Sequence, residues 1–364
     1  MKVALVHDWL TNLGGAERVV AVLHEMFPDA PIYTSVYATK RLPLLKDADI
    51  RTSWLQHWPL AQKKHQLYPM LRTLAFESFD FSEYDLVISS SSAEAKGIIT
   101  PTETLHISYI HTPTRYYWSG YDDYLQNPGL GIFNPLAKLT LPRVVKKMRR
   151  WDFAAAQRPD VLIANSTTVA ERIKLYYKRD AQILHPPVDV QRFAQLQNDD
   201  SDYLLVVSRL IPYKRVDLAV RACTKLNKRL IVVGDGSELK KLKALAGPTV
   251  EFRGQLPDQE VTRLFTNCRA FIFTAFEDFG ITPVEAMAAG KPVIAYGKGG
   301  ITDSVVHKTT GILFDNQSVE SLCSAIVLFE KTQFDSKKIR SHSEKFSNEQ
   351  FINAINTVIQ EHLL

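Results

Sequence analysis

Cysteine is scarce in this sequence. The 364 residues include three cysteines, Cys223, Cys268 and Cys323, and no two of them have the C-x-x-C spacing. An odd number of widely separated cysteines argues against a disulfide framework. We therefore expect the protein to work in a reducing, cytoplasmic environment.

Long apolar runs are also absent. No stretch of the chain reaches about 18 consecutive apolar residues, the length at which a membrane-spanning helix is expected. The opening segment MKVALVHDWL has one lysine and a short apolar run that ends at Asp8. We expect neither a signal peptide nor a membrane span at this position.

Strong charge of one sign and the common phosphate-binding motifs are missing as well. The net charge is +5, and neither G-x-G-x-x-G nor G-x-x-x-x-G-K-[ST] occurs. We expect no nucleic-acid partner. The positive side chains concentrate in the first half, at Lys63, Lys64, His65, Arg72, Lys146, Lys147, Arg149, Arg150 and Arg158. This clustering predicts a surface for anions there.

What the sequence does contain is a repeated alternation of short β-branched runs with amphipathic helical patterns. KVALVHD, DLVISSS, LHISYIH and DVLIANS mark the first half, and YLLVVSR, RLIVVGDG, TVEFRG, AFIFTA, PVIAY and GILF mark the second. This is βαβ patterning, and it occurs twice. The chain is also longer than the ~250–300 residues that one core supports. The pattern predicts two α/β, doubly wound, Rossmann-like domains.

Paired prolines and an Asn/Asp/Ser cluster interrupt the pattern in HPPVDVQRFAQLQNDDSD, so we place a hinge near residues 187 to 202. We predict an N-terminal domain over 1–190, a C-terminal domain over 191–345, and a final helix over 346–364 that packs back on the N-terminal domain. The two domains are expected to face each other across a cleft. In such sheets ligands bind beyond the carboxyl ends of the strands.

Two features follow strands of the first half. Gly14 and Gly15 precede a helix that is expected to run to about Phe27, and glycines at a helix N-terminus let backbone N–H groups approach an anion. A plain tight turn is the alternative.

His111 ends the strand LHISYIH, where it could act as a hydrogen-bond donor or general acid/base, or be a structural histidine. The aromatic run after it, Tyr116 to Trp118, suits either sugar stacking or packing.

In the second half, Arg209 and Lys214 follow the strand YLLVVSR. Two cations so placed suit a diphosphate whose charge grows as it departs, although a solvated basic turn explains them too. The next strand ends in Gly234, Asp235 and Gly236, a turn that could admit phosphate or ribose.

The segment EDFGITPVEAMAAGKP carries the most specific pattern. Thr282, Pro283 and Glu285 fit a helix start with Thr as N-cap, Pro at N1 and Glu at N3, which is a capping box. That reading leaves Glu277 and Gly280 unexplained. A glycine beside free helix N–H groups suggests an anion, and the two glutamates can accept hydrogen bonds from hydroxyl groups beside it. The combination describes a sugar nucleotide.

These residues resemble a known family. EDFGITPVEAMAAGKPVIA resembles the E-x7-E motif of retaining GT-B glycosyltransferases of family GT4, and GGAER, YIHTP, VSRLIPYKR, VGDG and FRGQLPD follow that family's order. The segments HDWL, FESFDFSEYDLVISSSSAEAKG and YIHTPTRYYW resemble a bacterial subgroup of O-antigen and polysaccharide mannosyltransferases that use GDP-mannose. The resemblance implies transfer of a hexose to a lipid-linked or oligosaccharide acceptor.

The resemblance also implies roles for residues of this chain. His111, Arg209, Lys214 and Glu277 would be catalytic: the cations neutralise the diphosphate, Glu277 faces the hydroxyls of the donor sugar, and His111 hydrogen-bonds the transferred sugar. The other implied donor-binding residues are Gly14, Gly15, Asp235, Gly236, Leu256, Asp258, Phe279, Gly280, Ile281, Thr282 and Glu285. Among them Glu285 would hold the ribose, and Leu256 and Asp258 would lie beside the base.

The family implies retention of configuration without a carboxylate nucleophile. We expect a front-face reaction in which the departing phosphate takes the acceptor's proton, a route that depends on positioning and charge stabilisation. No metal cofactor is expected. The D-x-D spacing at Asp200 and Asp202 lies in the predicted hinge and not at a strand end. Other readings that remain are a UDP-sugar donor, a sugar-nucleotide epimerase, a phosphorylase, and a non-catalytic sugar-nucleotide sensor.

Segment 54–72, WLQHWPLAQKKHQLYPMLR, mixes apolar and basic residues. With Trp54, Trp58, Lys63 and Lys64 it could lie at an anionic membrane surface and receive a lipid-linked acceptor. A packed helix with a solvated basic edge is the alternative. We expect peripheral association with the inner face of the cytoplasmic membrane.

Overall fold

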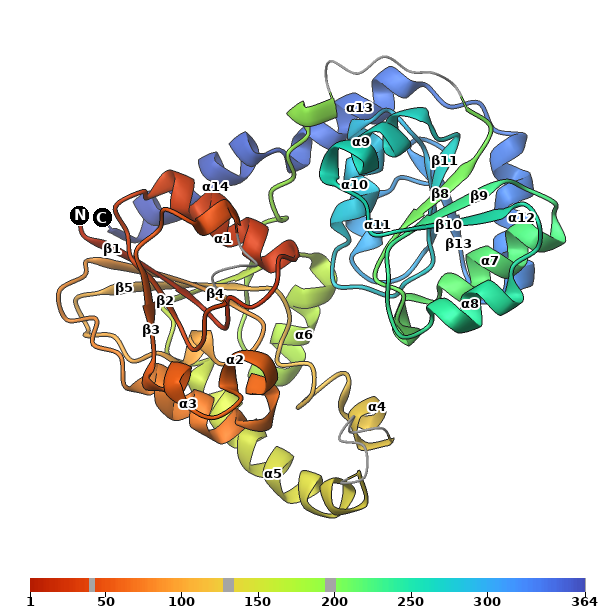
Figure 1. The fold of residues 1–364 in the computed structure, drawn as a ribbon. Helices are drawn as coiled ribbons and strands as arrows, with labels where there is room; N and C mark the ends of the chain where they lie inside the picture. Colours follow the sequence, from red (N-terminus) through yellow and green to blue (C-terminus); the bar gives the residue numbers. More distant parts are fainter. Residues whose placement is uncertain (39–42, 127–133, 194–200, 364) are drawn as a thin grey trace. The chain divides into compact units, whose positions relative to one another are not determined.

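The computed structural model describes residues 1–38, 43–126, 134–193 and 201–363. The chain forms two compact units, which can be followed by colour in Figure 1. Unit 1 comprises Met1–His185 and Ile352–Leu364, and unit 2 comprises Pro186–Phe351. The boundaries predicted from the sequence lie at 190/191 and 345/346.

Unit 1 is built on a parallel sheet with the strand order β3-β2-β1-β4-β5-β6-β7. The strands are β1 (Val3–His7), β2 (Ile32–Thr34), β3 (Ile50–Thr52), β4 (Leu86–Ser91), β5 (Leu105–Ile110), β6 (Val161–Ala164) and β7 (Gln182–Ile183). The helices are α1 (Gly15–Met26), α2 (Ala61–Lys64), α3 (Pro69–Glu77), α4 (Tyr121–Gln126), α5 (Asn134–Ala155) and α6 (Thr167–Tyr177). Helix α14 (Asn348–Leu363) ends the described chain.

The central strands of unit 1 are buried on both faces. Helix α1 lies on one side of the sheet, and α3 and α5 lie on the other (Figure 1). Alternate residues of a strand point to opposite faces, so Ala4 and Val6 of β1 share a cluster with Phe76 of α3. Both faces being covered explains why β4 and β5 read as continuous buried runs.

Unit 2 has a second parallel sheet, with the order β10-β9-β8-β11-β12-β13. Its strands are β8 (Leu204–Val207), β9 (Leu230–Val233), β10 (Val250–Gly254), β11 (Ala270–Phe273), β12 (Val293–Tyr296) and β13 (Gly311–Phe314). Its helices are α7 (Val216–Lys225), α8 (Leu239–Leu245), α9 (Asp258–Asn267), α10 (Ile281–Ala288), α11 (Ile301–Ser304), α12 (Val319–Glu330) and α13 (Ser336–Ser343).

The strands of unit 2 divide their side chains between two cores. Leu205 of β8 packs with Phe265 of α9 and Val284 of α10 on one face. Its neighbour Leu204 packs with Leu218 of α7 on the other face. The period of two along each strand therefore produces a helix–sheet–helix sandwich. The prediction of two doubly wound α/β units is confirmed.

The three cysteines all belong to unit 2. Cys223, Cys268 and Cys323 are buried free thiols. Burial is the main cause that raises the pKa of Cys223 and of Cys268 to about 12. A thiol with so high a pKa stays protonated and unreactive in the folded unit.

Candidate functional site

The start of α10 differs from the predicted capping box. The helix begins at Ile281 with Gly280 as its N-cap, and no side chain caps it. The predicted capping box is therefore wrong: Thr282 is inside the first turn and Pro283 is the third helical residue. Proline is tolerated there because the first four N–H groups of a helix have no partner within it.

Gly280 is the N-cap residue directly before α10. Its φ is +96°, a conformation that side-chain-bearing residues rarely adopt, and a Cβ there would lie 3.1 Å from Phe273. The first turn of α10 therefore presents backbone N–H groups without a side-chain cap, an arrangement suited to an anion. The positive end of the helix dipole acts in the same direction.

Glu277 forms an ion pair with Lys214, which ends the short 3₁₀ helix η8 (Pro212–Lys214) after β8. The two side chains are 17% and 15% exposed, so the pair is shielded but reachable. The Lys214 carbonyl also accepts a hydrogen bond from Thr274 Oγ1 at 2.9 Å. The sequence pattern predicted separate roles for the two residues, and the structure brings them together.

A second glycine pair, Gly299 and Gly300, fixes the backbone of this loop and was not predicted from the sequence. The Gly300 N–H donates to the Glu277 carbonyl at 2.9 Å. A Cβ on Gly299 would lie 2.5 Å from that carbonyl oxygen, and a Cβ on Gly300 would lie 2.0 Å from the Asp278 oxygen. The signal was available, because KGG follows the strand PVIAY as GG follows the first strand.

Glu285 lies one turn inside α10 and is buried. Its Oε1 is 3.2 Å from Nη2 of Arg192, which belongs to the 3₁₀ helix η7 (Gln191–Phe193) at the start of unit 2. The Arg192 Nε atom is buried without a hydrogen-bond partner in the described structure. Arg192 was not singled out from the sequence because it lies in the predicted hinge, far along the chain from the motif.

The turns after β8 and β9 meet, as expected at one edge of a parallel sheet. The Leu210 N–H donates to the Asp235 carbonyl at 2.8 Å. A Cβ on Gly234 would lie 1.9 Å from the Ser208 oxygen, so the contact requires glycine. Arg209 is exposed, and its Nη2 donates to Tyr213 Oη at 3.0 Å.

Other residues predicted to bind the donor also lie in unit 2. Leu256 packs partly buried against the core after β10, and Asp258 is exposed at the start of α9. Phe279 is buried at 3% exposure. Asp235 Oδ1 accepts a hydrogen bond from the Gly236 N–H at 2.7 Å. These placements leave the predicted roles open.

In unit 1, His111 follows β5 and is 9% exposed. Its Nε2 lies 2.7 Å from Ser90 Oγ, and its carbonyl accepts a hydrogen bond from Asn165 Nδ2 at 3.0 Å. Burial lowers the pKa of His111 to about 3, and the neighbouring His7 acts in the same direction. The imidazole is therefore neutral near pH 7.

Gly14 is the N-cap of α1, and no side-chain hydrogen bond caps that helix. Gly14 and Gly15 are both exposed. A Cβ on Gly14 would lie 2.9 Å from Glu17 Oε2, the end of a side chain. The predicted helix is present, but it begins at Gly15, so only Gly14 precedes it; it ends at Met26, one residue before the expected position.

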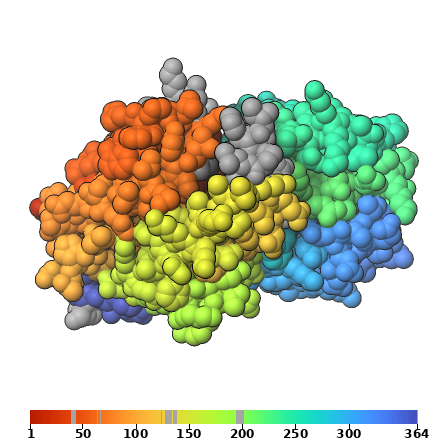
Figure 2. All heavy atoms as spheres, turned by 90° about the horizontal axis from the view of Figure 1, so that it is seen from below, coloured from red at the N-terminus to blue at the C-terminus, as the bar shows by residue number. Residues whose placement is uncertain are grey.

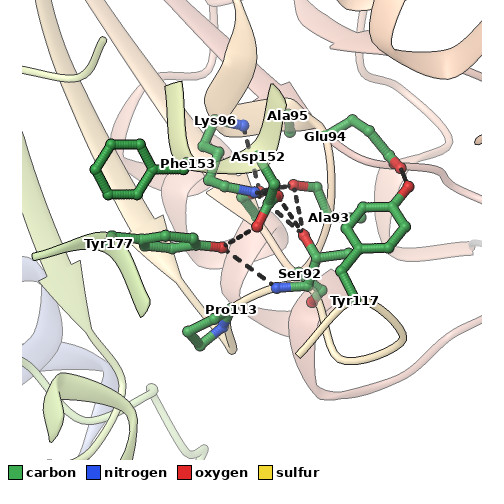
Figure 3. Close-up of polar contacts among 12 residues, drawn as sticks. Ser92, Ala93, Glu94, Ala95, Lys96, Pro113, Tyr117, Asp152, Phe153 and Tyr177 are labelled. Atoms are coloured by element: carbon green, nitrogen blue, oxygen red, sulfur yellow. Dashed lines mark hydrogen bonds and ion pairs between the residues drawn. The ribbon is translucent and has the colours of Figure 1, made fainter. Parts of the chain in front are cut away.

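A network of buried charges includes Thr114 and Trp118, which follow His111 along the chain, and no pattern in the sequence predicted it. Asp152 of α5 accepts hydrogen bonds from Lys96 Nζ (2.6 Å), Thr114 Oγ1 (2.7 Å), Trp118 Nε1 (2.7 Å) and Tyr177 Oη (2.7 Å). Figure 3 shows Lys96 and Tyr177 pointing toward this carboxylate. The side chains of Lys96 and Asp152 are 1% and 0% exposed.

Glu94 forms the second buried pair. It accepts two hydrogen bonds from Arg72, from Nε and Nη2, each at 2.9 Å. The Tyr116 and Tyr117 hydroxyls lie 3.3 Å from Glu94 Oε1, and Figure 3 shows Tyr117 directed at it. The polar ends of Tyr116 to Trp118 are therefore engaged inside unit 1, which favours packing over sugar stacking.

The predicted anion surface of unit 1 is smaller than expected. His65 and Arg72 are buried, because Arg72 pairs with Glu94 and its Nη1 donates to the His65 carbonyl at 2.9 Å. Arg158 pairs with Glu77 at 2.6 Å. Including the buried His65 and Arg72 in the anion surface was wrong. Lys64, Lys146, Lys147 and Arg150 are exposed.

The segment predicted to meet a membrane is folded into short helices. Trp54 begins η3 (Trp54–His57) and Trp58 follows it; they are 41% and 46% exposed and contact each other edge to face. Leu60 is 60% exposed. The segment, orange in Figure 2, forms part of the molecular surface. The side chain of Lys63 is outside the described set.

Within the described chain, no helix combines the length and apolarity needed to cross a membrane. The same residues contain no group of three or more His, Cys, Asp or Glu side chains placed to hold a metal ion. Asp200 lies outside the described residues, and Asp202 pairs with Arg269 at 3.1 Å.

Two family models match the chain. Residues 13–192 match Glycosyltransferase Family 4, and residues 188–348 match Glycosyl transferases group 1. The boundary between the matches falls close to the division between the two units.

Several mannosyltransferases are similar over part of the chain. The alpha-1,3/1,6-mannosyltransferase ALG2 of Dictyostelium discoideum is 38% identical over 104 residues, 27% of this chain and 24% of that protein. The GDP-Man:Man(3)GlcNAc(2)-PP-Dol alpha-1,2-mannosyltransferase of Xenopus laevis is 32% identical, covering 46% and 40%. A GDP-mannose-dependent alpha-(1-6)-phosphatidylinositol monomannoside mannosyltransferase of Mycobacterium tuberculosis is 30% identical, covering 40% and 45%. The chain spans less than half the length of these curated relatives.

Solved structures match over the whole length. Anabaena Alr3699/HepE in complex with UDP has a TM-score of 0.71 at 18% identity, covering 99% of this chain and 100% of that one. The lipopolysaccharide outer core galactosyltransferase WaaB has a TM-score of 0.68 at 18% identity, covering 99% of each chain. At such identity the likeness speaks to the fold. The chain has the GT-B fold, with residues 13–192 similar to Glycosyltransferase Family 4 and residues 188–348 similar to the glycosyl transferases group 1 family.

Proposed function

We propose that the protein is a retaining glycosyltransferase that moves a hexose, with mannose from GDP-mannose as the first choice, to a lipid-linked or oligosaccharide acceptor. The product would be a bacterial cell-surface polysaccharide of the O-antigen kind. The observation that carries the proposal is the pairing of Lys214 with Glu277 in the loop that leads to the uncapped N-terminus of α10. The group 1 family match and the mannosyltransferase relatives support it.

The donor diphosphate needs positive charge and N–H donors. The first turn of α10, at Gly280 to Thr282, offers backbone N–H groups, and Arg209 and Lys214 offer cations. A carboxylate accepts hydrogen bonds from hydroxyl groups, so Glu277 is assigned to the donor sugar and Glu285 to the ribose. We assign Leu256 and Asp258 to the base.

Lys214 gives the site a means of responding to the reaction. In the absence of donor its ammonium neutralises Glu277. A bound diphosphate would attract the same ammonium more strongly, because its negative charge is greater and grows as it leaves. Lys214 would then turn toward the diphosphate, and the Glu277 oxygens would become available to sugar hydroxyls.

The proposed transfer conserves atoms and electrons without an enzyme nucleophile. The bond between the anomeric carbon and the phosphate oxygen breaks, and the nucleoside diphosphate keeps the electron pair. The acceptor oxygen bonds to the anomeric carbon on the same face, and its proton passes to the departing phosphate. Positioning and charge stabilisation supply the rate enhancement. A covalent glycosyl adduct on Glu277, detected by mass spectrometry, would contradict this route.

The experiment measures nucleoside diphosphate release from a panel of GDP- and UDP-sugars, with a membrane lipid extract as the acceptor source. We expect acceptor-dependent GDP release from GDP-mannose. Glu277→Ala should lower the rate by about 10²–10³-fold, the size of effect seen when a transition-state contact is removed. Glu330→Ala is the matched control, because Glu330 also forms a partly buried ion pair in unit 2, with Lys228.

The outcomes separate the parts of the proposal. Release from a UDP-sugar alone would keep the reaction and overturn the donor. Equal rates in wild type and Glu277→Ala would return Glu277 to a structural role, and conversion of the sugar nucleotide without release of diphosphate would favour an epimerase.

The proposed cations make a metal cofactor unnecessary, so activity should persist in excess chelator. Loss of activity that a divalent cation restores would contradict that point.

We also propose that the exposed Trp54, Trp58 and Leu60, with the lysines at 63 and 64, contact an anionic membrane where a lipid-linked acceptor is available. Tryptophan suits the interfacial zone of a bilayer, and each lysine near an anionic surface adds about 1 kcal/mol. The protein would then work at the cytoplasmic face of the membrane.

Lys63→Glu with Lys64→Glu should reduce sedimentation with anionic liposomes and leave the low binding to neutral liposomes unchanged. Lys337→Glu with Lys338→Glu is the control, because it makes the same charge change at an adjacent pair of exposed lysines in unit 2. Equal losses in both double variants would mean that net charge, and not this segment, determines the binding.

A further inference from the structure

A line of buried polar groups leads to His111 across three neighbouring strands. His7 ends β1, Ser90 is in β4, and His111 follows β5. His7 and Ser90 face each other in the strand register. The His7 Nδ1 atom lies 2.9 Å from the Ser90 carbonyl oxygen and 3.2 Å from Ser90 Oγ, and Ser90 Oγ lies 2.7 Å from His111 Nε2.

The directions of these hydrogen bonds follow from the chemistry of the atoms. A backbone carbonyl oxygen only accepts, so His7 Nδ1 must carry a hydrogen. That hydrogen also faces Ser90 Oγ, which therefore acts as an acceptor toward His7. The hydroxyl proton of Ser90 needs an acceptor of its own. Within the described residues, His111 Nε2 is the acceptor that its geometry offers.

His111 Nε2 is then an acceptor, and a neutral imidazole carries one N–H group. The hydrogen of His111 must be on Nδ1. No described residue forms a hydrogen bond with Nδ1, so this donor is left for a ligand. Asn165 holds the backbone of the same residue through its bond to the His111 carbonyl.

Glu17 of α1 lies close to the other ring nitrogen of His7. Its Oε1 lies 3.9 Å from His7 Nε2, and the two side chains are 10% and 3% exposed. Burial by itself lowers the pKa of His7, but the hydrogen bond and charge of Glu17, the charge of Asp8 and the Ser90 carbonyl outweigh it and raise the pKa above its usual value. When His7 is protonated, its Nδ1 carries a hydrogen and its charge disfavours a second positive charge on His111.

We propose that Glu17, His7 and Ser90 are positioning residues that hold His111 as a neutral imidazole with its hydrogen on Nδ1. His111 thus faces its ligand as a hydrogen-bond donor and not as a general base. The assignment of that ligand as the transferred sugar rests on the proposed function. The assignment of the tautomer does not.

The tautomer can be measured directly in the full-length protein. Nitrogen-15 NMR of labelled histidine distinguishes a protonated ring nitrogen from an unprotonated one, and the spectrum of His111→Gln identifies the signals of His111. We expect a protonated Nδ1 and an unprotonated Nε2 at pH 7. Ser90→Ala should abolish this single form and give the Nε2–H tautomer or a mixture. An Nε2–H tautomer in the wild type, or an unchanged pattern in Ser90→Ala, would overturn the inference.

The adjacent residue supplies a matched control. Ser89 Oγ lies 2.8 Å from Nε2 of the buried His106, so Ser89→Ala removes the same kind of hydrogen bond one position away. It should leave the His111 signals unchanged.

A second pair of variants covers the case in which Ser90→Ala does not fold. His7→Asn keeps a donor amide near the place of Nδ1, whereas His7→Gln places its amide near Nε2. The asparagine variant should preserve the His111 tautomer better than the glutamine variant. Better preservation of the tautomer in His7→Gln than in His7→Asn would contradict the proposed hydrogen bonds from His7 through Ser90 to His111.

The transfer assay tests the consequence for the reaction. Ser90→Ala should lower kcat about tenfold, the loss expected from one hydrogen bond, with KM for the donor changed less than about threefold. Ser89→Ala should change neither value by more than about threefold, and an equal drop in kcat there would make the Ser90 effect structural. If the protein transfers no sugar, the proposed function fails and the NMR result still decides the tautomer.

Discussion

A buried histidine makes stability depend on pH, and His106 is the clearest case. It is 0% exposed, and burial, with Arg179 and Arg158 acting in the same direction, lowers its pKa to about 3. The unfolded chain, with a pKa near 6.5, therefore binds a proton between about pH 6.5 and pH 3 that the folded chain does not. Stability contributed by this group is present above that range and is lost as the pH falls.

For this reason we expect the free energy of unfolding to fall by about 2 kcal/mol between pH 7 and pH 5 through His106 alone. His106→Asn should reduce the fall by that amount. Urea unfolding followed by circular dichroism at both pH values measures it. The same histidine-to-asparagine change at the exposed His57 is the control for the substitution itself. A fall of the same size in His106→Asn would mean that other groups cause it.

Residue patterns identified donors and acceptors but not their partners. The strand ends were predicted well, because β-branched runs followed by polar residues mark where a parallel strand meets solvent. The pairs Arg72–Glu94, Lys96–Asp152 and Arg192–Glu285 were not predicted. Each joins residues far apart in sequence, so only the packed fold brings them within reach.

At the scale of elements, Asp152 ties α5 to the loops after β4 and β5. It accepts from Lys96 in one loop and from Thr114 and Trp118 in the other. Asp152→Asn should destabilise the protein by about 3–5 kcal/mol, because Lys96 is left as a buried charge without its partner. Thermal and urea unfolding give the value.

The control for that substitution is an ion pair in solvent. Asp180 pairs with Lys174 at 2.6 Å, with exposures of 87% and 62%. Asp180→Asn should cost less than about 1 kcal/mol. Similar losses for the two variants would contradict the expected extra cost of leaving the buried Lys96 without its partner.

The start of α10 illustrates a limit of local rules for elements. Thr282, Pro283 and Glu285 match a capping box in sequence, yet the helix begins earlier, at Ile281. The positive φ of Gly280 lets the chain enter the helix without a side-chain cap. Short strands were missed for a related reason: β2, β3 and β7 have three, three and two residues, too few to establish a period.

At the scale of the whole molecule, the last residues of the chain belong to unit 1, although α14 begins in unit 2. Ile355, Val358 and Ile359 are buried. Ending the chain after Phe351 would remove them, and burying each such side chain contributes about 1.5–3 kcal/mol. We expect the truncated protein to become sensitive to proteases in unit 1.

Limited proteolysis with mass spectrometry locates the cleavage sites. Cuts should increase within residues 1–185 and remain rare within 201–345. Removing only residues 363 and 364 is the control, because Leu363 is 45% exposed. Faster cleavage confined to unit 2 in the longer truncation would contradict the assignment of this segment.

The division of the chain also separates two natural reporters. All five tryptophans, at 9, 54, 58, 118 and 151, are in unit 1, and all three cysteines are in unit 2. Indole fluorescence therefore follows the opening of one unit, while the rate at which a thiol reagent modifies the buried cysteines follows the opening of the other. The unmutated protein carries its own two-channel readout of whether its halves unfold together or one after the other.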